Sequence, residues 1–425
     1  MEKVKDGDKD QDKEREETAE EKVDRLAIEV CGLIDQLLTL QCSLPPITEP
    51  PFPEPWLKLR RAIKEKETER ELLLEDQRAS KVVEEYLKEN PSILEKVDEC
   101  PICLEPIFDV GKASFFICCG KPMCGSCKEP LLAAGNDICP FCRGPFPSGG
   151  EELSILRTKA AQGKAWAQCI LGQKFYYGLT GLVEDDQKAE SLLRSAADQG
   201  HAGAQYYLGQ YERQKDNVVE ACRQFEAAAS QGHMNALGFL GVQHYGGRGV
   251  EYDEMKAVRF LTVCSKLTTE DRSPHRLLAD CFALEQGGLE DSPIREVYYL
   301  KPVLEESEST PRVMVFYAEL LWSLSRRFYP DYEIAPSGDN SVPEALFWYR
   351  RAHAMSGDAE TLVNAETLPY IEEYESSIRE LCSCCFKSLS TDNRKRCVEC
   401  KAVYYCSWEC GAADWKAGHK KDCVK

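Results

Sequence analysis

Cysteine is the residue type whose number and spacing point most directly to chemistry in this chain. The sequence contains 22 cysteines, of which eight lie between positions 100 and 142 and eight between 382 and 423. The first residues, MEKVKDGDKDQDKEREETAEE, have no apolar core and do not resemble a secretory signal. In a reducing compartment, clustered cysteines bind metal more often than they form disulfides. We therefore expect metal sites in a protein of the cytoplasm or the nucleus.

The first cluster contains enough thiols for two complete metal sites. It consists of three Cys-x2-Cys pairs and two adjacent cysteines, and no histidine lies among them. Each pair can offer two thiolates from one tight turn, and Zn²⁺ prefers four such ligands in a tetrahedron. Two four-cysteine sites would leave no cysteine over. The eight are Cys100, Cys103, Cys118, Cys119, Cys124, Cys127, Cys139 and Cys142.

The order of these pairs resembles a RING finger, over residues 98–147. The resemblance implies that the first and third pairs share one zinc ion and that the second and fourth share the other. Cys119 then replaces the histidine usual in the family, as in all-cysteine variants, while Lys121 is no ligand. The family separates the two ligands that are adjacent here, so one intact site remains an alternative to two. The implied sets are Cys100, Cys103, Cys124 and Cys127, and Cys118, Cys119, Cys139 and Cys142.

The resemblance also implies a contact surface for a ubiquitin-conjugating enzyme. RING fingers do no covalent chemistry, but they hold the conjugating enzyme and restrain its thioester-linked ubiquitin. The family uses an aliphatic residue in the first pair, a proline in the last pair and a basic residue after it. These are Ile102, Pro140 and Arg143 here. The alternative is that Ile102 and Pro140 only shape the zinc turns, in a non-catalytic scaffold, so enzyme activity stays open.

The second cluster, CSCCFKSLSTDNRKRCVECKAVYYCSWECGAADWKAGHKKDC at 382–423, closely resembles a MYND zinc finger. MYND fingers generally bind proline-rich peptides. Two features depart from the family: Gly411 replaces the usual glutamine, and three residues instead of two separate Trp415 from His419. His419 and Cys423 are four residues apart, which is one face of a helix. The implied sites are Cys382, Cys385, Cys406 and Cys410, and Cys397, Cys400, His419 and Cys423.

A repeat occupies residues 151–360. The pair Leu-Gly recurs at 171, 208 and 240, and AADQGH at 196–201 returns as AASQGH at 228–233. A period in the thirties with small residues at fixed positions predicts stacked helix pairs, because small side chains let helices approach closely. These residues resemble Sel-one-like repeats, a branch of the tetratricopeptide superfamily. The resemblance implies a scaffold that presents a surface for peptides or proteins.

The N-terminal region contains a heptad-like seam. Its apolar residues are Val23, Leu26, Val30, Leu33, Leu37 and Leu40. Steps of three and four favour a helix that packs on its own domain, or one that self-associates weakly through 23–40. The expected divisions are a disordered charged tail (1–22), this helix (23–42), a proline-rich linker (43–56), a charged helical region (57–97), the RING-like module (98–147), the repeats (151–360), a linker helix (361–381) and the MYND-type finger (382–423).

Together these features predict a mainly α protein, in which a solenoid of helix pairs is flanked by two small zinc modules and preceded by a disordered and helical region. The net charge of −19 disfavours nucleic acid as a partner. No apolar run is long enough to span a membrane. We find no catalytic sequence of a methyltransferase, no phosphate loop and no hydrolase triad. We therefore expect an adaptor with four zinc ions that binds proteins or peptides, with ligase activity or a purely structural scaffold as the two interpretations.

Overall fold

The computed structural model describes residues 17–43, 54–108, 114–133, 138–147, 149–267, 273–304, 310–328, 344–345, 348, 351–352, 395–398, 404–405 and 407–414. The chain divides into two compact units. Unit 1 contains residues 1–77, 325–343 and 369–425, and unit 2 contains residues 78–324 and 344–368. Among the described helices, none combines the length and the apolar character needed to cross a bilayer.

Unit 1 begins with helix α1, Ala19–Ser43, which starts inside the segment expected to be a disordered tail. The reason is a capping box at its first turn. The Thr18 hydroxyl accepts a hydrogen bond from the Glu21 N–H at 3.2 Å, and the Glu21 carboxylate accepts one from the Thr18 N–H at 2.8 Å. This reciprocal pair satisfies two N–H groups that a helix end otherwise leaves unpaired.

The heptad-like seam of α1 packs inside the chain. Val23, Leu26 and Leu37 are buried, and Lys22 forms an ion pair with Glu69 of the following helix at 2.7 Å. Burial of the seam within one chain supports packing in its own domain. Weak self-association through this helix stays a prediction.

Helix α2, Glu54–Glu89, starts earlier than the predicted end of the proline-rich linker. Pro55 lies in its first turn, where the missing N–H has no intrahelical partner to lose, so proline is tolerated there. The last part of α2 belongs to unit 2, where Tyr86 packs with Phe260 at a ring distance of 6.0 Å. The rest of unit 1 that the structure describes includes strands β3, Lys395–Arg396, and β4, Tyr404–Tyr405, and helix α17, Trp408–Asp414.

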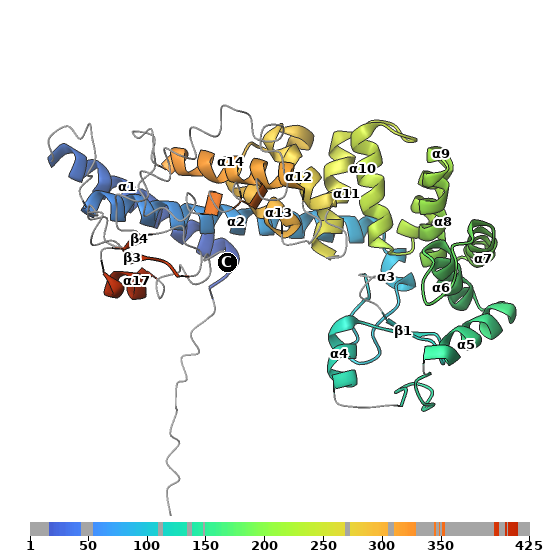
Figure 1. Cartoon of the computed structure of the whole chain (residues 1–425). Coiled ribbons are helices and arrows are strands. Elements are labelled where there is room, and N and C mark those ends of the chain that lie inside the picture. The colour runs from blue at the N-terminus through green and yellow to red at the C-terminus, as the bar shows by residue number, and fades with distance from the viewer. Residues whose placement is uncertain are drawn as a thin grey trace, which may run out of the picture. The chain divides into compact units, whose positions relative to one another are not determined.

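Helix pairs that stack in sequence order form most of unit 2 (Figure 1). Each helix packs mainly on its neighbours along the chain, which is the pattern of a solenoid. The predicted mainly α solenoid is therefore confirmed. Its helices are α5 Gly149–Ala161, α6 Ala165–Tyr176, α7 Asp186–Asp198, α8 Ala202–Gln214, α9 Val218–Ala229, α10 Met234–Gly246, α11 Glu254–Leu267, α12 Ser273–Ala283 and α13 Pro293–Leu304, with a 3-10 turn at Gln286–Gly288. Helix α14, Pro311–Phe328, follows along the chain, and its last four residues are assigned to unit 1.

The recurring glycine of each Leu-Gly pair lies where two helices touch. A Cβ atom on Gly209 would lie 2.7 Å from the ring of Phe225, and one on Gly172 would lie 2.9 Å from Leu193. Gly241 meets Leu261 in the same way, also at 2.9 Å. A side chain of the neighbouring helix occupies the space that a residue larger than glycine would need at these positions. Close helix packing therefore explains why glycine recurs at the repeat period.

We predict that Gly209→Val lowers the free energy of unfolding of the repeats by about 1–3 kcal/mol, because the added methyl groups overlap Phe225. Gly246→Val is the matched control. Gly246 also lies in a helix of unit 2, but it is exposed, and the nearest atom to an added Cβ is 3.6 Å away. Urea unfolding followed by circular dichroism should show a change within about 0.5 kcal/mol for the control. Equal effects of the two substitutions would contradict the packing argument.

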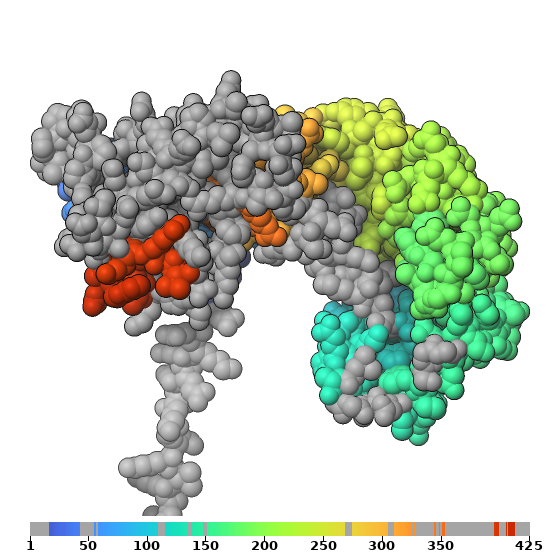
Figure 2. Space-filling view, in the orientation of Figure 1, coloured from blue at the N-terminus to red at the C-terminus, as the bar shows by residue number. Residues whose placement is uncertain are grey.

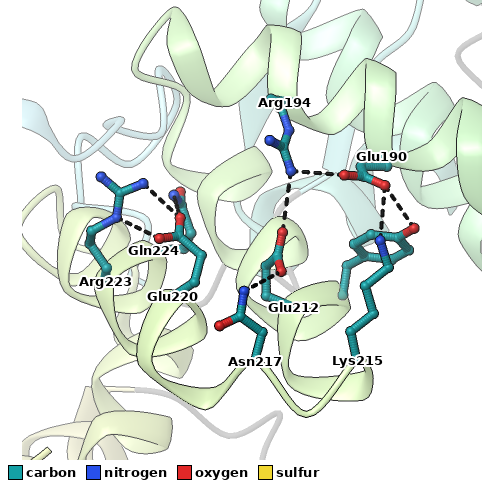
Figure 3. Close-up of polar contacts among 9 residues, drawn as sticks. Glu190, Arg194, Glu212, Lys215, Asn217, Glu220, Arg223 and Gln224 are labelled. Atoms are coloured by element: carbon teal, nitrogen blue, oxygen red, sulfur yellow. Dashed lines mark hydrogen bonds and ion pairs between the residues drawn. The ribbon is translucent and has the colours of Figure 1, made fainter. Parts of the chain in front are cut away.

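A polar network connects α7 with the end of α8 (Figure 3). Glu190 accepts hydrogen bonds from Arg194 at 2.8 Å, from Tyr211 at 2.9 Å and from Lys215 at 3.1 Å. Arg194 also donates to the buried Glu212 at 3.2 Å. The hydrogen bonds from Lys215 and Tyr211 hold the pKa of Glu190 below its usual value, against the opposing effect of burial.

The lowered pKa of Glu190 predicts a pH-dependent contribution to stability. A carboxylate whose pKa is lower in the folded state stabilises the fold above its unfolded pKa of about 4.3, and this contribution disappears as the pH falls through the folded pKa. Glu190→Gln should therefore lower the melting temperature at pH 7, and the difference from the wild type should shrink below about pH 4. Glu226→Gln, at an exposed position outside this network, serves as the control. A difference that is constant with pH would contradict the electrostatic explanation.

Candidate metal centre

Two turns of identical backbone geometry present four of the eight clustered cysteines. In the first turn, the Leu104 N–H donates to the Cys100 carbonyl at 2.8 Å, and the Cys100 N–H donates to the Glu105 carbonyl at 2.9 Å. Arg143, Cys139 and Gly144 repeat this pattern at 2.9 and 2.8 Å. The residue after each pair has a positive φ, 62° at Leu104 and 57° at Arg143. Each turn thereby brings its two cysteines to the same side of the backbone.

A β-hairpin and a short helix present the other four cysteines. Strand β1, Ser114–Phe116, pairs with β2, Lys121–Met123, in antiparallel register. Cys118 and Cys119 lie in the turn between these strands, where Gly120 has a φ of 74°. Cys124 follows β2 directly, and Cys127 lies in the first turn of helix α4, Gly125–Ala133.

The structure brings these eight cysteines together as two groups of four, each with its sulfur atoms within 4.8 Å of one another. The Cys103 and Cys124 sulfurs are 3.7 Å apart in one group. In the other, Cys119 lies 3.8 Å from Cys139, and Cys118 lies 3.5 Å from Cys142. The groups are Cys100, Cys103, Cys124 and Cys127, and Cys118, Cys119, Cys139 and Cys142.

These sulfur separations fit a zinc ion and not a disulfide. A disulfide bond joins two sulfurs at about 2.05 Å. Four sulfurs placed tetrahedrally around zinc at about 2.3 Å lie about 3.8 Å from one another. The adjacency of Cys118 and Cys119 does not prevent this arrangement, because the turn at Gly120 lets both sulfurs reach the same group.

The thiols in each group have opposed tendencies to ionise. Burial disfavours the Cys100 thiolate, but N–H groups of Cys103, Cys124 and Ile102 donate to its sulfur and bring its pKa below the usual value. Burial and the neighbouring thiols of Cys142 and Cys139 raise the pKa of Cys118. Such crowding limits how many thiolates can coexist without a cation. A divalent metal ion would remove that conflict by accepting all four sulfurs.

Aromatic packing between the two groups holds the module in shape. The ring of Phe116 stacks on Phe146 at 5.4 Å and meets Phe141 edge-on at 5.3 Å. Ile107 and Met123 complete this small buried core. The core explains why two separate metal groups can keep a fixed mutual position within so short a segment.

The three residues predicted to contact a conjugating enzyme are exposed on this module. Ile102 has 52% of its surface exposed, and Pro140 and Arg143 are also exposed. Each lies on one of the two cysteine turns, so each position also shapes a turn, as the scaffold alternative requires. Exposure of a large apolar side chain such as Ile102 leaves it available to a partner.

The module is packed tightly on the first repeat. A Cβ atom on Gly120 would lie 2.3 Å from the indole of Trp166 in α6, so the metal-binding turn lies directly against that ring. Ile117 packs in one cluster with Leu156 of α5 and Leu171 of α6. Figure 2 shows the surfaces of the module and the first repeats next to each other. In the sequence, Trp166 differs from the residue at the same position of the next repeat, which is Gly203.

Of the second cysteine cluster, the structure describes two predicted ligands. Cys397 is buried and Cys410 is half-buried, next to the pair formed by β3 and β4. Gly411, where the family usually has glutamine, lies close to Tyr405: a Cβ atom added there would be 3.2 Å from that ring. The remaining predicted residues of this cluster lie outside the described residues: Cys382, Cys385, Cys400, Cys406, Trp415, His419 and Cys423.

Residues 382–423 match the family model of the MYND finger, which confirms the resemblance for that segment. Ubiquitin carboxyl-terminal hydrolase 19 of Arabidopsis thaliana is 48% identical over 42 residues, which are 10% of this chain and 6% of that protein. The chain therefore spans a small part of that relative.

Two solved structures resemble the helical region. A Sel1 repeat protein from Oxalobacter formigenes has a TM-score of 0.37 and 21% identity, over 58% of this chain and 87% of its own. A protective antigen of uropathogenic Escherichia coli displaying an SLR fold has a TM-score of 0.39 and 19% identity, over 53% of this chain and 51% of its own. The assignment of helix-pair repeats rests on the helix packing described above.

We predict that Cys119→Ser reduces the metal content of the purified, zinc-loaded chain by one ion in native mass spectrometry, because it removes one of four sulfurs from a closed site. Cys31→Ser, at an exposed position on α1, should leave the count unchanged. An unchanged count for Cys119→Ser would mean that the group of Cys118, Cys119, Cys139 and Cys142 holds no metal.

Proposed function

We propose that this protein is a zinc-dependent adaptor for protein interactions whose residues 98–147 act as the RING-type module of a ubiquitin ligase. The observation that carries the proposal is the interleaving of the two sulfur groups: the first pair groups with the third, and the second with the fourth. This arrangement is the one that the RING resemblance implies. A chain of independent metal turns would instead group neighbouring pairs.

In this proposal, four zinc ions stabilise the fold at two modules. Two ions bind the two four-sulfur groups of residues 98–147, whose spacing supports tetrahedral zinc. The other two bind the MYND-type finger, through Cys382, Cys385, Cys406 and Cys410, and through Cys397, Cys400, His419 and Cys423. Each set supplies four protein ligands, so the proposed role of the metal is structural.

The proposed ligase role belongs to residues that position another enzyme. Ile102 and Pro140 would pack against an apolar surface of a charged ubiquitin-conjugating enzyme, and Arg143 would restrain the bound ubiquitin. Their exposure supports this assignment. The repeats and the MYND-type finger would then select the protein that is modified, in the cytoplasm or the nucleus.

A non-catalytic adaptor is the second candidate, and a specific observation favours it. The positive φ of Arg143 and the turn hydrogen bonds around Cys139 give that position a structural task that is independent of any partner. Both candidates require the same metal sites and the same interaction surfaces. They differ in whether the module accelerates ubiquitin transfer.

We predict that the zinc-loaded chain accelerates the discharge of ubiquitin from a conjugating enzyme to free lysine, and that Ile102→Ala reduces this acceleration about tenfold or more. A tenfold loss corresponds to about 1.4 kcal/mol, the size expected for one exposed aliphatic contact at an interface. The assay is single-turnover discharge, measured across a panel of conjugating enzymes.

Val183→Ala is the matched control, since it truncates an exposed aliphatic residue in the repeats. It should leave the rate unchanged, and both variants should keep the wild-type metal content. Full activity of Ile102→Ala would contradict the proposed contact. If the folded, zinc-loaded chain accelerates ubiquitin discharge from no conjugating enzyme in the panel, the ligase role is wrong and the non-catalytic adaptor is the remaining candidate.

A further inference from the structure

A cavity of about 410 Å³ lies in unit 2 where the metal module meets the repeats. The module contributes Phe115 of β1 and Pro122 of β2, and the segment after α3, Ser92–Lys96, contributes Asp98. The repeats contribute Trp166 and Tyr207, from α6 and α8. A volume of this size is enough for several atoms of a ligand, in the range of small binding sites.

One position of the repeat is filled differently in successive units, and both residues at this position line the cavity. AWAQ at 165–168 aligns with AGAQ at 202–205, so Trp166 of the first unit corresponds to Gly203 of the second. Gly203 lines the cavity but is buried, and a Cβ atom added there would lie 3.2 Å from His201 and 3.5 Å from Cys169. Gly200 also lines it, and a Cβ atom added there would meet nothing within 4 Å. Glycine at such places allows another backbone to approach closely.

Amide side chains and aromatic rings face this glycine-lined space. Gln173 donates from its amide nitrogen to the Tyr207 hydroxyl at 2.6 Å, and Gln231 donates to Gln205 at 2.6 Å. These bonds fix both amides through their nitrogens, and the amide oxygens take no part in them. Carbonyl oxygens held in this way can accept from the N–H groups of an extended peptide.

The charges around the cavity argue against a strongly anionic ligand. Lys96 and Asp98 are both exposed at its edge and carry opposite charges. Burial lowers the pKa of His201, and it lowers that of His233 to about 3, so both rings are neutral near pH 7. His233 is 3% exposed and stacks on Tyr206 at 4.4 Å. The cavity therefore offers aromatic surface and neutral hydrogen-bonding groups.

We propose that this cavity binds an extended peptide segment of a partner protein, with one proline or aliphatic side chain held between Trp166, Tyr207 and Pro122. Close backbone approach at Gly200 and the amide oxygens of Gln173 and Gln231 recognise the peptide main chain. The proposal rests on the protein-interaction role proposed above and does not depend on ubiquitin transfer.

Metal binding and peptide binding are coupled in this arrangement. Phe115 and Pro122 belong to the hairpin whose turn carries Cys118 and Cys119. Loss of metal from that turn removes the constraint on one wall of the cavity. Because coupling between two binding events is reciprocal, a bound peptide also stabilises the metal site.

The test starts from the full zinc-loaded chain and a displayed library of random 12-residue peptides. Peptides that are enriched are synthesised, and their dissociation constants are measured by fluorescence polarisation. Gly203→Trp places a large ring against the cavity-lining residues His201 and Cys169, at the position where the preceding repeat already has tryptophan, and it should weaken binding at least tenfold. Val219→Trp introduces the same residue at an exposed position of α9, outside the cavity, and should change binding less than twofold.

Two further variants complete the test. Gln173→Ala removes one amide and should weaken peptide binding severalfold. If Gly203→Trp lowers the melting temperature, so that its effect on binding cannot be separated from its effect on folding, Gln173→Ala is the variant that tests the peptide site. Cys119→Ser should weaken binding as well, because the hairpin wall depends on that metal group. Ubiquitin discharge by Gly203→Trp should equal that of the wild type, which separates this proposal from the ligase assignment. The proposal is overturned if no peptide is enriched, or if Gly203→Trp and Gln173→Ala both bind the enriched peptides as the wild type does.

Discussion

The contact between the Trp166 indole and the backbone at Gly120 is the constraint on which the arrangement of unit 2 depends. Two adjacent cysteines require a sharp turn, and the positive φ of Gly120 supplies it without the cost that a side chain would add. Because Gly120 has no side chain, the indole of Trp166 can pack directly against the turn. Gly120 therefore has two roles: it forms the turn that brings Cys118 and Cys119 together, and it allows that turn to pack on the first repeat. A larger residue there would disturb both at once.

The repeats combine regular helix packing with positions whose residues differ from one unit to the next, and one such position lies at the cavity. Gly172, Gly209 and Gly241 keep the helix pairs at one spacing in three successive units. Against that regular frame, the position of Trp166 becomes Gly203 in the next unit. Trp166 packs on the turn at Gly120, and both Trp166 and Gly203 line the cavity beside that turn. A solenoid can vary such positions independently, because each unit contacts mainly its neighbours.

Local patterns predicted most of what the structure shows for these modules. Cys-x2-Cys turns and Leu-Gly pairs are short-range features, so their spacing was enough to indicate metal turns and helix pairs. Helix α1 starts at Ala19, before the expected residue 23, because Thr18 and Glu21 form a capping box within a strongly charged segment. The contact of Trp166 with Gly120 could not be predicted, since it joins positions 46 residues apart that no periodicity relates. The cavity likewise depends on how two modules meet.

The ligand sets also limit what this protein can do with metal. A zinc ion that activates water needs an open coordination position, usually beside three protein ligands. Each sulfur group here supplies four thiols around one point, with separations that match a closed tetrahedron. A metal ion bound by four such sulfurs would have no position left for water or substrate, so it would act by holding backbone and side chains in place. In the ligase proposal, the effect on catalysis comes from how Ile102, Pro140 and Arg143 would meet the surface of another enzyme. The packing of Trp166 on Gly120 holds the turn that carries Cys118 and Cys119 against the first repeat, so these three exposed residues have a fixed position relative to that repeat.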